Sequence, residues 1–405
     1  MNYNTYPIAD LIDEIAMGPF GSNIKVDCFV DKGIPVLNGS NLEGFELSEK
    51  SFRYVTEEKA DSLKKANAYK GDVVITHRGT LGQIVYIPQT AQRDRYVISQ
   101  SQFRVKCNKK VLPEYFVYYF HTPIGQHKLL SNASQVGVPA LARPSSTFQK
   151  IEIEIPDLET QKKVVKLIGS LQTRIKTNAE INENLQQQAA AIFRSWFVDC
   201  VPFGGTAPDE WENVTLEGIT ALVSRGITPK YADDTDQIVI NQKCIRNHMI
   251  DLSFARSHRP KVINDKWLRF GDLLINSTGD GTLGRAAQVW FQPHNLTVDS
   301  HVTIVRPAAE NMTFYIGLWG TQHEREIESL HTGSTGQTEL PRDRVKALEL
   351  LLPDKETLNR FNALIAPMAA TIVSNQEENN RLVSIRDALL PRLMSGEIDV
   401  SAIQI

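Results

Sequence analysis

Two long stretches of the chain repeat apolar residues at spacings that alternate between four and three. The first series is Val164, Ile168, Leu171, Ile175, Asn178, Asn182, Leu185, Ala189, Ile192 and Trp196, and adding 197 to each position gives a second series from Phe361 to Leu393. The average period of 3.5 residues is typical of a coiled-coil seam. Each stretch follows a Pro-Asp pair whose aspartate, Asp157 or Asp354, is expected to cap a long helix. The simpler alternative is a helix that packs only on its own globule.

Both series place two asparagines in matching central positions, Asn178 and Asn182 in the first and Asn375 and Asn379 in the second. A buried amide is costly unless another polar group meets it. If the two helices run antiparallel about a pseudo-two-fold axis, Asn178 faces Asn379 and Asn182 faces Asn375. The seam would be about 50 Å long, and we expect it to act as a spacer between two globules.

Two residues of the second helix depart from this pattern. Arg386 falls opposite Leu171, and we expect its side chain to direct its charge outward. Pro367 lies inside the helix and is expected to kink or interrupt it just upstream.

Outside the helices, short β-rich runs alternate with turn residues and short helical pieces. The runs are apolar and bounded by Gly, Pro and Asn, as in Asp72–Thr76 and Val302–Val305, whereas Pro113–His121 and Thr313–Thr321 read as helices. This pattern predicts a mixed α/β (α+β) globule.

The globule is written twice. Gly71-Asp72-Val73-Val74-Ile75 recurs 200 residues later as Gly271-Asp272-Leu273-Leu274-Ile275, and Gly79-Thr80-Leu81-Gly82 recurs from Gly281. A period near 200 residues indicates a duplicated domain rather than a solenoid. The predicted division is into globules at 1–156 and 201–353 and long helices at 157–200 and 354–405. Two similar globules on a spacer suit a ligand with two contact points, and DNA is the obvious candidate.

The composition is that of an ordinary globular protein. The 405 residues include 41% hydrophobic and 22% charged residues, which excludes a disordered chain, a collagen-like chain and a small disulfide scaffold. Four widely spaced cysteines argue against a zinc ribbon and against disulfide staples. The N-terminus lacks the pattern of a signal peptide, and no apolar stretch is long enough to span a bilayer, so we expect a soluble, cytoplasmic protein. The net charge of −3 confines any nucleic-acid contact to local patches.

Catalytic motifs are missing from the sequence. It has no phosphate-binding loop, no His-Glu-x-x-His, no Gly-x-Ser-x-Gly and no Asn-Pro-Pro-Tyr/Phe. Asp157, Glu159 and Lys162 resemble a nuclease triad only in composition, and a helix N-cap explains them better. The histidines show no metal-ligand spacing. We therefore expect a binding protein without catalytic or metal-ligating residues.

The loop after each Gly-Asp strand is the first candidate contact. It reads His77-Arg78-Gly79-Thr80 in the first copy and Ser277-Thr278-Gly279-Asp280 in the second. Glycine lets the backbone approach a phosphate, and Arg78 can reach guanine edges bidentately. A plain hairpin turn is the alternative.

Two further loop pairs are polar. Asn38, Ser40 and Asn41 align with Asn241, Gln242, Lys243 and Arg246, whose amides and cations suit adenine, guanine or phosphate, although Asn and Gly also simply form turns. The third pair contains Gln135 in the first copy and Ser334, Thr335 and Gln337 in the second, and a plain surface loop is its alternative. Clusters of basic residues around Arg93 and around Arg256 support DNA more weakly.

At several motifs the chain resembles the specificity subunit of a type I restriction-modification system. These motifs are Gly18-Pro19-Phe20-Gly21-Ser22 before Gly33-Ile34-Pro35; Gly226-Ile227-Thr228-Pro229-Lys230-Tyr231; both Gly-Asp…Gly-Thr-Leu-Gly strands; Ile192-Phe193-Arg194-Ser195-Trp196-Phe197-Val198-Asp199; and Leu389-Leu390-Pro391-Arg392-Leu393-Met394-Ser395-Gly396-Glu397-Ile398. The last two close the long helices and are the most specific. With the resemblance in view, the candidate DNA contacts also include Phe20, Ser22, Lys25, Arg143, Arg225, Thr228 and Lys230.

The resemblance implies two target-recognition domains that read the halves of a bipartite asymmetric DNA site, with paired antiparallel helices between them. It implies docking to two modification subunits, which carry S-adenosylmethionine and methylate adenine, and to restriction subunits that use ATP and Mg, so that no cofactor belongs to this chain. Four apolar residues are then expected to bind helix and partner together: Trp196, Phe197, Leu389 and Leu393. The alternatives are a solitary methylation system without a nuclease, or a coiled-coil scaffold with two ligand-binding domains.

Overall fold

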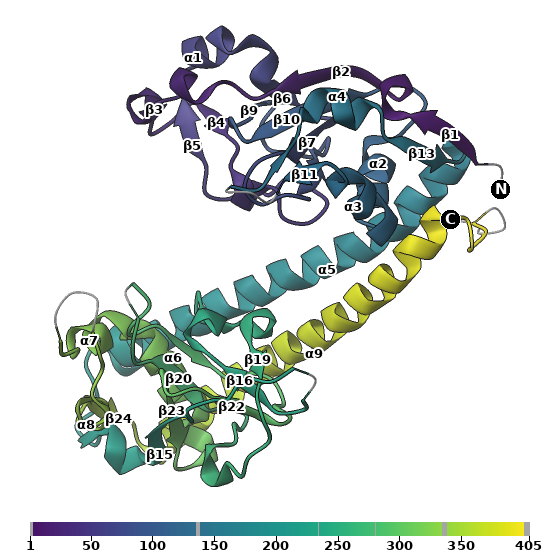
Figure 1. The fold of residues 1–405 in the computed structure, drawn as a ribbon. Coiled ribbons are helices and arrows are strands. Elements are labelled where there is room, and N and C mark those ends of the chain that lie inside the picture. The colour runs from purple at the N-terminus through teal and green to yellow at the C-terminus, as the bar shows by residue number, and fades with distance from the viewer. Residues whose placement is uncertain (1–2, 135–137, 234, 280, 334–337, 401–405) are drawn as a thin grey trace. The chain divides into compact units, whose positions relative to one another are not determined.

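The computed structural model describes residues 3–134, 138–233, 235–279, 281–333 and 338–400, and for Ser22 the backbone alone. The chain forms two compact units, Met1–Ile175 with Asn380–Ile405, and Lys176–Asn379. Two long helices, α5 (Leu158–Phe193) and α9 (Lys355–Met394), contribute a segment to each unit (Figure 1).

The first unit is built on an antiparallel four-stranded sheet in the order β2-β10-β7-β8. Its strands are β2 (Ile12–Met17), β10 (Gln102–Cys107), β7 (Asp72–Thr76) and β8 (Ile84–Tyr86). Both faces of β7 are buried, because Val73 and Ile75 pack into the cluster that contains α2 (Pro113–Phe120) while Val74 packs on the opposite side. The predicted alternation of short strands and helices is thus a layered α/β unit.

The first unit contains further sheets. A five-stranded sheet in the order β3-β5-β4-β9-β6 lies against the Val74 side, and β1 pairs with β13 next to α5. Their bounds are β3 (Phe29–Val30), β5 (Arg53–Val55), β4 (Ile34–Val36), β9 (Arg95–Val97), β6 (Asn67–Tyr69), β1 (Asn4–Pro7) and β13 (Glu152–Ile155).

The second unit repeats this plan. Its four-stranded sheet has the order β15-β23-β20-β21, formed by β15 (Thr220–Arg225), β23 (Val302–Pro307), β20 (Leu273–Asn276) and β21 (Ala286–Gln288). A three-stranded sheet of β19 (Arg256–Ser257), β16 (Ile238–Ile240) and β22 (Leu296–Val298) and the pair β14 (Glu212–Thr215) with β24 (Glu349–Leu352) complete it. The predicted duplication is therefore a duplication of topology.

A buried ion pair recurs at the start of the Gly-Asp strand in both copies. Arg306 Nε donates to Asp272 Oδ1 at 2.8 Å and its Nη2 to Oδ2 at 2.7 Å. In the first copy Arg104 Nη1 donates to Asp72 at 3.3 Å and Nη2 to Glu14 at 3.0 Å. Removing one partner of such a pair costs about 3–5 kcal/mol because the other charge stays buried. The aspartate of the repeated motif is thus structural.

Both long helices begin at the expected N-caps. Asp157 Oδ1 accepts a hydrogen bond from Thr160 N at 2.9 Å, and Asp354 Oδ1 accepts from Thr357 N at 2.9 Å. The Thr357 hydroxyl also donates to Asp354 Oδ2 at 2.6 Å. The hydrogen bond from the Thr160 amide lowers the pKa of Asp157, and the one from the Thr357 hydroxyl lowers the pKa of Asp354. The capping interpretation of the Pro-Asp pairs is confirmed.

Within the second unit, α5 and α9 pair in the predicted register. Asn178 Nδ2 donates to Asn379 Oδ1 at 2.9 Å and to Glu378 at 2.8 Å, and Asn375 Nδ2 donates to Asn182 Oδ1 at 2.8 Å. Both partner sums equal 557, as an antiparallel pseudo-two-fold pairing requires. Each asparagine layer is thus joined by a hydrogen bond between the two helices.

Two expectations about α9 are corrected. The helix is not interrupted at Pro367: that residue and Ala363, whose carbonyl loses its amide partner, are exposed, while neighbouring Ile365 and Ala369 are fully buried. Arg386 does not direct its charge to solvent. Its side chain is only 17% exposed, its Nη1 donates to Gln172 at 2.9 Å and its guanidinium stacks 5.2 Å from the Phe45 ring centroid.

The Asn182–Asn375 layer gives a stability prediction. Asn182→Leu should destabilise the second unit by about 1–3 kcal/mol in urea unfolding, because it leaves the half-buried Asn375 amide without the Asn182 oxygen that accepts its hydrogen bond. The double variant Asn182→Leu/Asn375→Leu should recover most of that loss, and the exposed Asn184→Leu serves as control. A double variant as unstable as the sum of the two single variants would contradict the pairing.

Candidate nucleic-acid interface

The polar loops of each copy meet because of strand direction. In the first unit β10 runs antiparallel to both β2 and β7, with Phe103 opposite Met17 and Gln102 opposite Thr76. The ends of β2 and β7 and the start of β10 therefore lie at one edge of the sheet. The loops that follow Met17 and Thr76 and the one that precedes Gln102 are held there together.

Backbone bonds join four loops at this edge of the first unit. Gly18 N donates to Gln102 O at 2.8 Å, His77 N to Ser101 O at 2.9 Å, and Gly79 N to Pro139 O at 2.9 Å. The loop that contains Gly39 joins them through Gln83, whose Nε2 donates to Gly39 O at 2.9 Å. A Cβ on Gly18 would lie 1.9 Å from Ser99 O, so this close approach requires glycine.

Several predicted contacts of the first copy are exposed on this edge. Phe20 is 83% exposed. His77 is half-buried, its Nε2 lies 3.1 Å from Gln100 O, and burial lowers the pKa of its ring. The other exposed members are Lys25, Ser40, Arg78, Gly79, Thr80 and Arg143.

The second unit forms the same edge. Gly226 N donates to Val302 O at 3.1 Å, and Ser277 N donates to His301 O at 2.8 Å. Thr278 Oγ1 donates to Gln242 Oε1 at 3.3 Å and lies 2.8 Å from His301 Nδ1.

The predicted members of this second edge differ in exposure. The exposed ones are Thr228, Lys230, Lys243 and Arg246, and the half-buried ones are Asn241, Gln242, Thr278 and Gly279. Six predicted contacts lie outside the described residues or, for Ser22, the described side chains: Ser22, Gln135, Asp280, Ser334, Thr335 and Gln337.

Two predicted contacts are wrong because their side chains are internal. Asn41 is 1% exposed and donates to Ser48 O at 2.9 Å and Lys50 O at 2.7 Å. Ser277 is 0% exposed and its hydroxyl lies 2.6 Å from Thr303 Oγ1. Both side chains hold a loop or strand in place.

Three more predicted contacts have structural partners. Asn38 and Asn241 cap equivalent 3-10 turns by accepting from Ser40 N and Lys243 N, each at 2.9 Å. Arg225 is 27% exposed and its Nη1 lies 2.6 Å from a Glu339 carboxylate oxygen. The asparagine positions were predicted as base readers because an amide that caps a turn and an amide that reads adenine look alike in sequence.

The loop before β10 and β23 was missed by sequence reasoning. Gln100 in the first copy and His301 in the second precede the central strand. They contact the loop that follows β7 or β20, through His77 and Thr278 respectively. Asp299 lies in the same loop, is 3% exposed, and accepts from His301 N at 2.9 Å. A search of residues just before the central strand of each copy would have found this loop.

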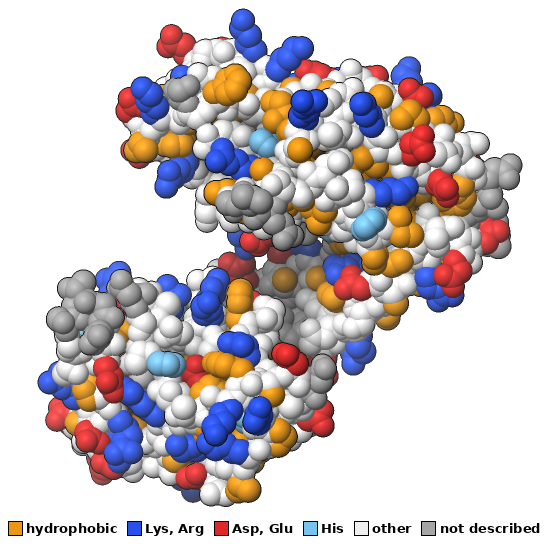
Figure 2. All heavy atoms as spheres, in the orientation of Figure 1, with side chains coloured by type: hydrophobic (Ala, Val, Ile, Leu, Met, Phe, Trp, Pro, Cys, Tyr) orange, Lys and Arg blue, Asp and Glu red, His pale blue; other side chains and the backbone are white. Residues whose placement is uncertain are grey.

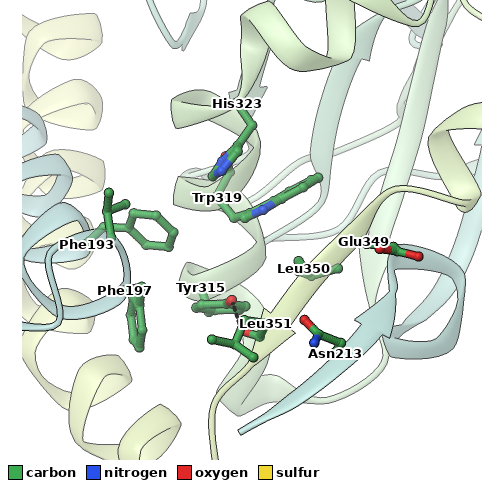
Figure 3. A pocket seen from close by; sticks show the side chains of 10 residues that line it. Phe193, Phe197, Asn213, Tyr315, Trp319, His323, Glu349, Leu350 and Leu351 are labelled. Carbon is green, nitrogen blue, oxygen red and sulfur yellow. Dashed lines mark hydrogen bonds between the residues drawn. The ribbon is translucent and has the colours of Figure 1, made fainter. Parts of the chain in front are cut away.

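The motif that closes α5 packs on its own unit. Phe193 and Phe197, the latter in a π-helical turn (Arg194–Val198), line a pocket of about 400 Å³ together with Tyr315, Trp319 and Leu351 (Figure 3). The Trp196 ring lies 5.9 Å from that of Phe361. In the first unit Leu389 and Leu393 pack in the core in the same way. These contacts account for the helix-closing motifs within the chain, and a partner role remains a prediction.

Comparison with known proteins shows which proteins the chain resembles. Residues 20–187 match the family described as type I restriction modification DNA specificity domain. The chain is 24% identical over 419 residues to the type I restriction enzyme MjaIX specificity subunit of Methanocaldococcus jannaschii, covering 96% of this chain and 92% of that protein. The chain is therefore similar to the specificity subunits of type I restriction enzymes, and residues 20–187 match a DNA specificity domain. The resemblance inferred from its motifs is thereby confirmed.

Two further comparisons agree with this similarity. The HindI specificity subunit of Haemophilus influenzae is 24% identical over 412 residues, covering 81% of this chain and 87% of that protein. A solved type I restriction-modification S subunit from M. genitalium has a similar fold, with a TM-score of 0.57 at 13% identity, covering 97% and 96% of the two chains. The predicted mixed α/β fold with long helices is confirmed.

Within the described ranges of the chain, no group of three or more His, Cys, Asp and Glu side chains is arranged to hold a metal ion. Across the same ranges, no helix is long and apolar enough to cross a membrane.

The buried carboxyl of Asp299 gives a pH prediction. Burial raises the pKa of its carboxyl, so the ionised form destabilises the folded state above that pKa and the penalty disappears as pH falls through it. Asp299→Asn keeps the acceptor for His301 N. It should raise the melting temperature at pH 7, by roughly 2–4 °C per kcal/mol gained, and the gain should shrink toward acidic pH. The exposed Asp236→Asn is the control, and a pH-independent gain would contradict the assignment.

Proposed function

We propose that the chain reads a bipartite, asymmetric DNA sequence, one half with each copy of its globule, and imposes that sequence on partner subunits. The observation that supports this most is the pair of equivalent sheet edges. Both copies use equivalent strands and two equivalent backbone hydrogen bonds to hold the loops at this edge, yet they present different side chains there. A shared backbone framework that presents different loop side chains suits two domains that recognise different half-sites.

The exposed side chains suggest how each edge divides its work. Arg78 in the first copy is an exposed cation that precedes Gly79. Lys243 in the second copy is an exposed cation in the turn that Asn241 caps. Cations at such places read guanine O6 and N7 in the major groove. Exposed Thr80, Thr228 and backbone amides suit phosphate oxygens, which fix orientation without reading sequence.

The chemistry belongs to the partners in this proposal. Two modification subunits supply S-adenosylmethionine-dependent adenine-N6 methylation, and restriction subunits supply ATP- and Mg-dependent translocation and cleavage. The chain itself is non-catalytic. The named relatives are specificity subunits of type I restriction enzymes, which is what supports this division of labour.

Mapping N6-methyladenine across a host genome tests the function directly. Cells with the chain and its modification subunit should carry methylation at one bipartite sequence, and cells without the chain should lose it. Exchanging residues 1–156 for those of a relative should change one half of the sequence and keep the other. A methylation pattern independent of the chain would contradict the proposal, and neighbouring genes for a restriction subunit distinguish a full system from a solitary methylation system.

Point variants test the two edges separately. Arg78→Ala should weaken discrimination in one half-site only, and Lys243→Ala in the other only, each by about 1–3 kcal/mol per affected base pair. Binding of the assembled complex to duplexes with single substitutions in either half measures this, and each variant is the control for the other. If both variants relax the same half-site, the assignment of one half to each copy is wrong.

A further inference from the structure

The second unit carries a basic surface that the first unit lacks. Residues 241–270, between β16 and the Gly-Asp motif, contain seven Lys and Arg and two Asp, a net charge of +5. The corresponding residues 38–70 of the first copy contain six basic and six acidic residues, a net charge of zero. The two copies share their strand framework, so this difference lies in the surface that the framework presents.

Four exposed cations of this region lie on segments that adjoin exposed Lys230, and we call the five of them the basic stripe: Lys230, Arg246, Arg256, Arg259 and Lys261. Arg259 N donates to Lys230 O at 2.8 Å, and β19, which begins at Arg256, pairs with β16. Figure 2 shows Lys and Arg side chains gathered over the part of the second unit where Figure 1 labels β16 and β22.

Aromatic rings support two of the arginines. The guanidinium carbon of Arg256 lies 3.6 Å from the centroid of the Tyr231 ring, and that of Arg246 lies 4.6 Å from the Phe254 ring. Stacking holds the planar guanidinium on its face and leaves its terminal N–H groups able to donate, while Nε of Arg246 donates to Lys243 O at 3.1 Å. An arginine that is already ordered loses less conformational entropy when it binds a phosphate.

The cations of the stripe have no acidic counterpart among the residues that the structure describes, since no described carboxylate lies within ion-pair distance of the five. In the first copy, by contrast, Arg95 and Lys70 lie 2.7 and 2.8 Å from Asp61 and Asp94. Five neighbouring cations repel one another unless an anion binds. A ligand with regularly spaced negative charges is the best match.

The stripe is continuous with the second copy's sheet edge. Asn241, which caps the turn that carries Lys243, donates from Nδ2 to Phe254 O at 2.7 Å and so connects that turn to the ring under Arg246. We propose that the basic stripe grips the phosphodiester backbone of DNA beside the half-site that the second copy reads. The inference rests on the proposed function. It adds that the backbone grip of this chain is asymmetric and concentrated in its second copy.

The salt dependence of binding tests this grip. The variant Arg256→Gln/Arg259→Gln/Lys261→Gln, assembled with the modification subunits, is titrated with a short duplex that contains the mapped site. Each lost phosphate contact lowers the slope of log K against log salt by about 0.9, so the slope should become shallower by about 2.7 and affinity should fall at low salt. The methylated sequence should stay the same, because phosphate contacts carry no sequence information.

A charge-matched variant in the first copy is the control. Lys50→Gln/Lys64→Gln/Lys65→Gln removes three exposed positive charges from the corresponding region and should leave the slope unchanged. Equal slopes in the two triple variants, or a changed methylated sequence in the stripe variant, would overturn the inference. A wild-type complex without sequence preference would instead contradict the proposed function, while the salt-slope difference between the two variants would still decide the stripe.

Discussion

A buried arginine–aspartate pair lies at one end of each four-stranded sheet. It fixes the register of the two central strands and so the position of the loops at the other end of the sheet. Asp272 directly precedes β20 and binds Arg306 of β23 through both carboxylate oxygens. A slip of one residue between these strands would separate the two buried charges, at a cost of about 3–5 kcal/mol. The strand register is therefore fixed, and with it the edge where β20 ends and β23 begins. Asp72 and Arg104 do the same in the first copy.

This arrangement separates structure from recognition within one short sheet. The ion pair and the apolar strand between Leu273 and Ile275 are internal, whereas the loops beyond the strand end reach solvent. Side chains in those loops can change without disturbing the core. The duplication shows this directly, since the two copies keep the glycines and the backbone bonds but differ in loop charge and side chain. The same freedom permits residues 38–70 of the first copy to be neutral overall while residues 241–270 of the second copy are basic.

Sequence reasoning was most successful where one local interaction decides the structure. The 3.5-residue period, the Pro-Asp caps and the paired asparagines predicted the helices and their register, because a buried amide has few acceptable neighbours. It was least successful for loop polar residues. Asn41 and Ser277 were predicted to contact DNA, yet both are buried and hydrogen-bonded within the chain. Sequence does not distinguish an amide that closes a turn from one that faces a ligand, and it gave no reason to notice His301.

The sequence by itself determined the duplication, the strand and helix types and the pairing of the asparagine layers, since these depend on periodicity and on neighbours close in sequence or related by the repeat. Only the tertiary structure decided which polar residues are available. Antiparallel pairing brings loops that are far apart in sequence, such as those at Gly18, Gly79 and Gln102, to one edge. Burial of a side chain depends on all of these neighbours together, and for that reason no single loop sequence could reveal it.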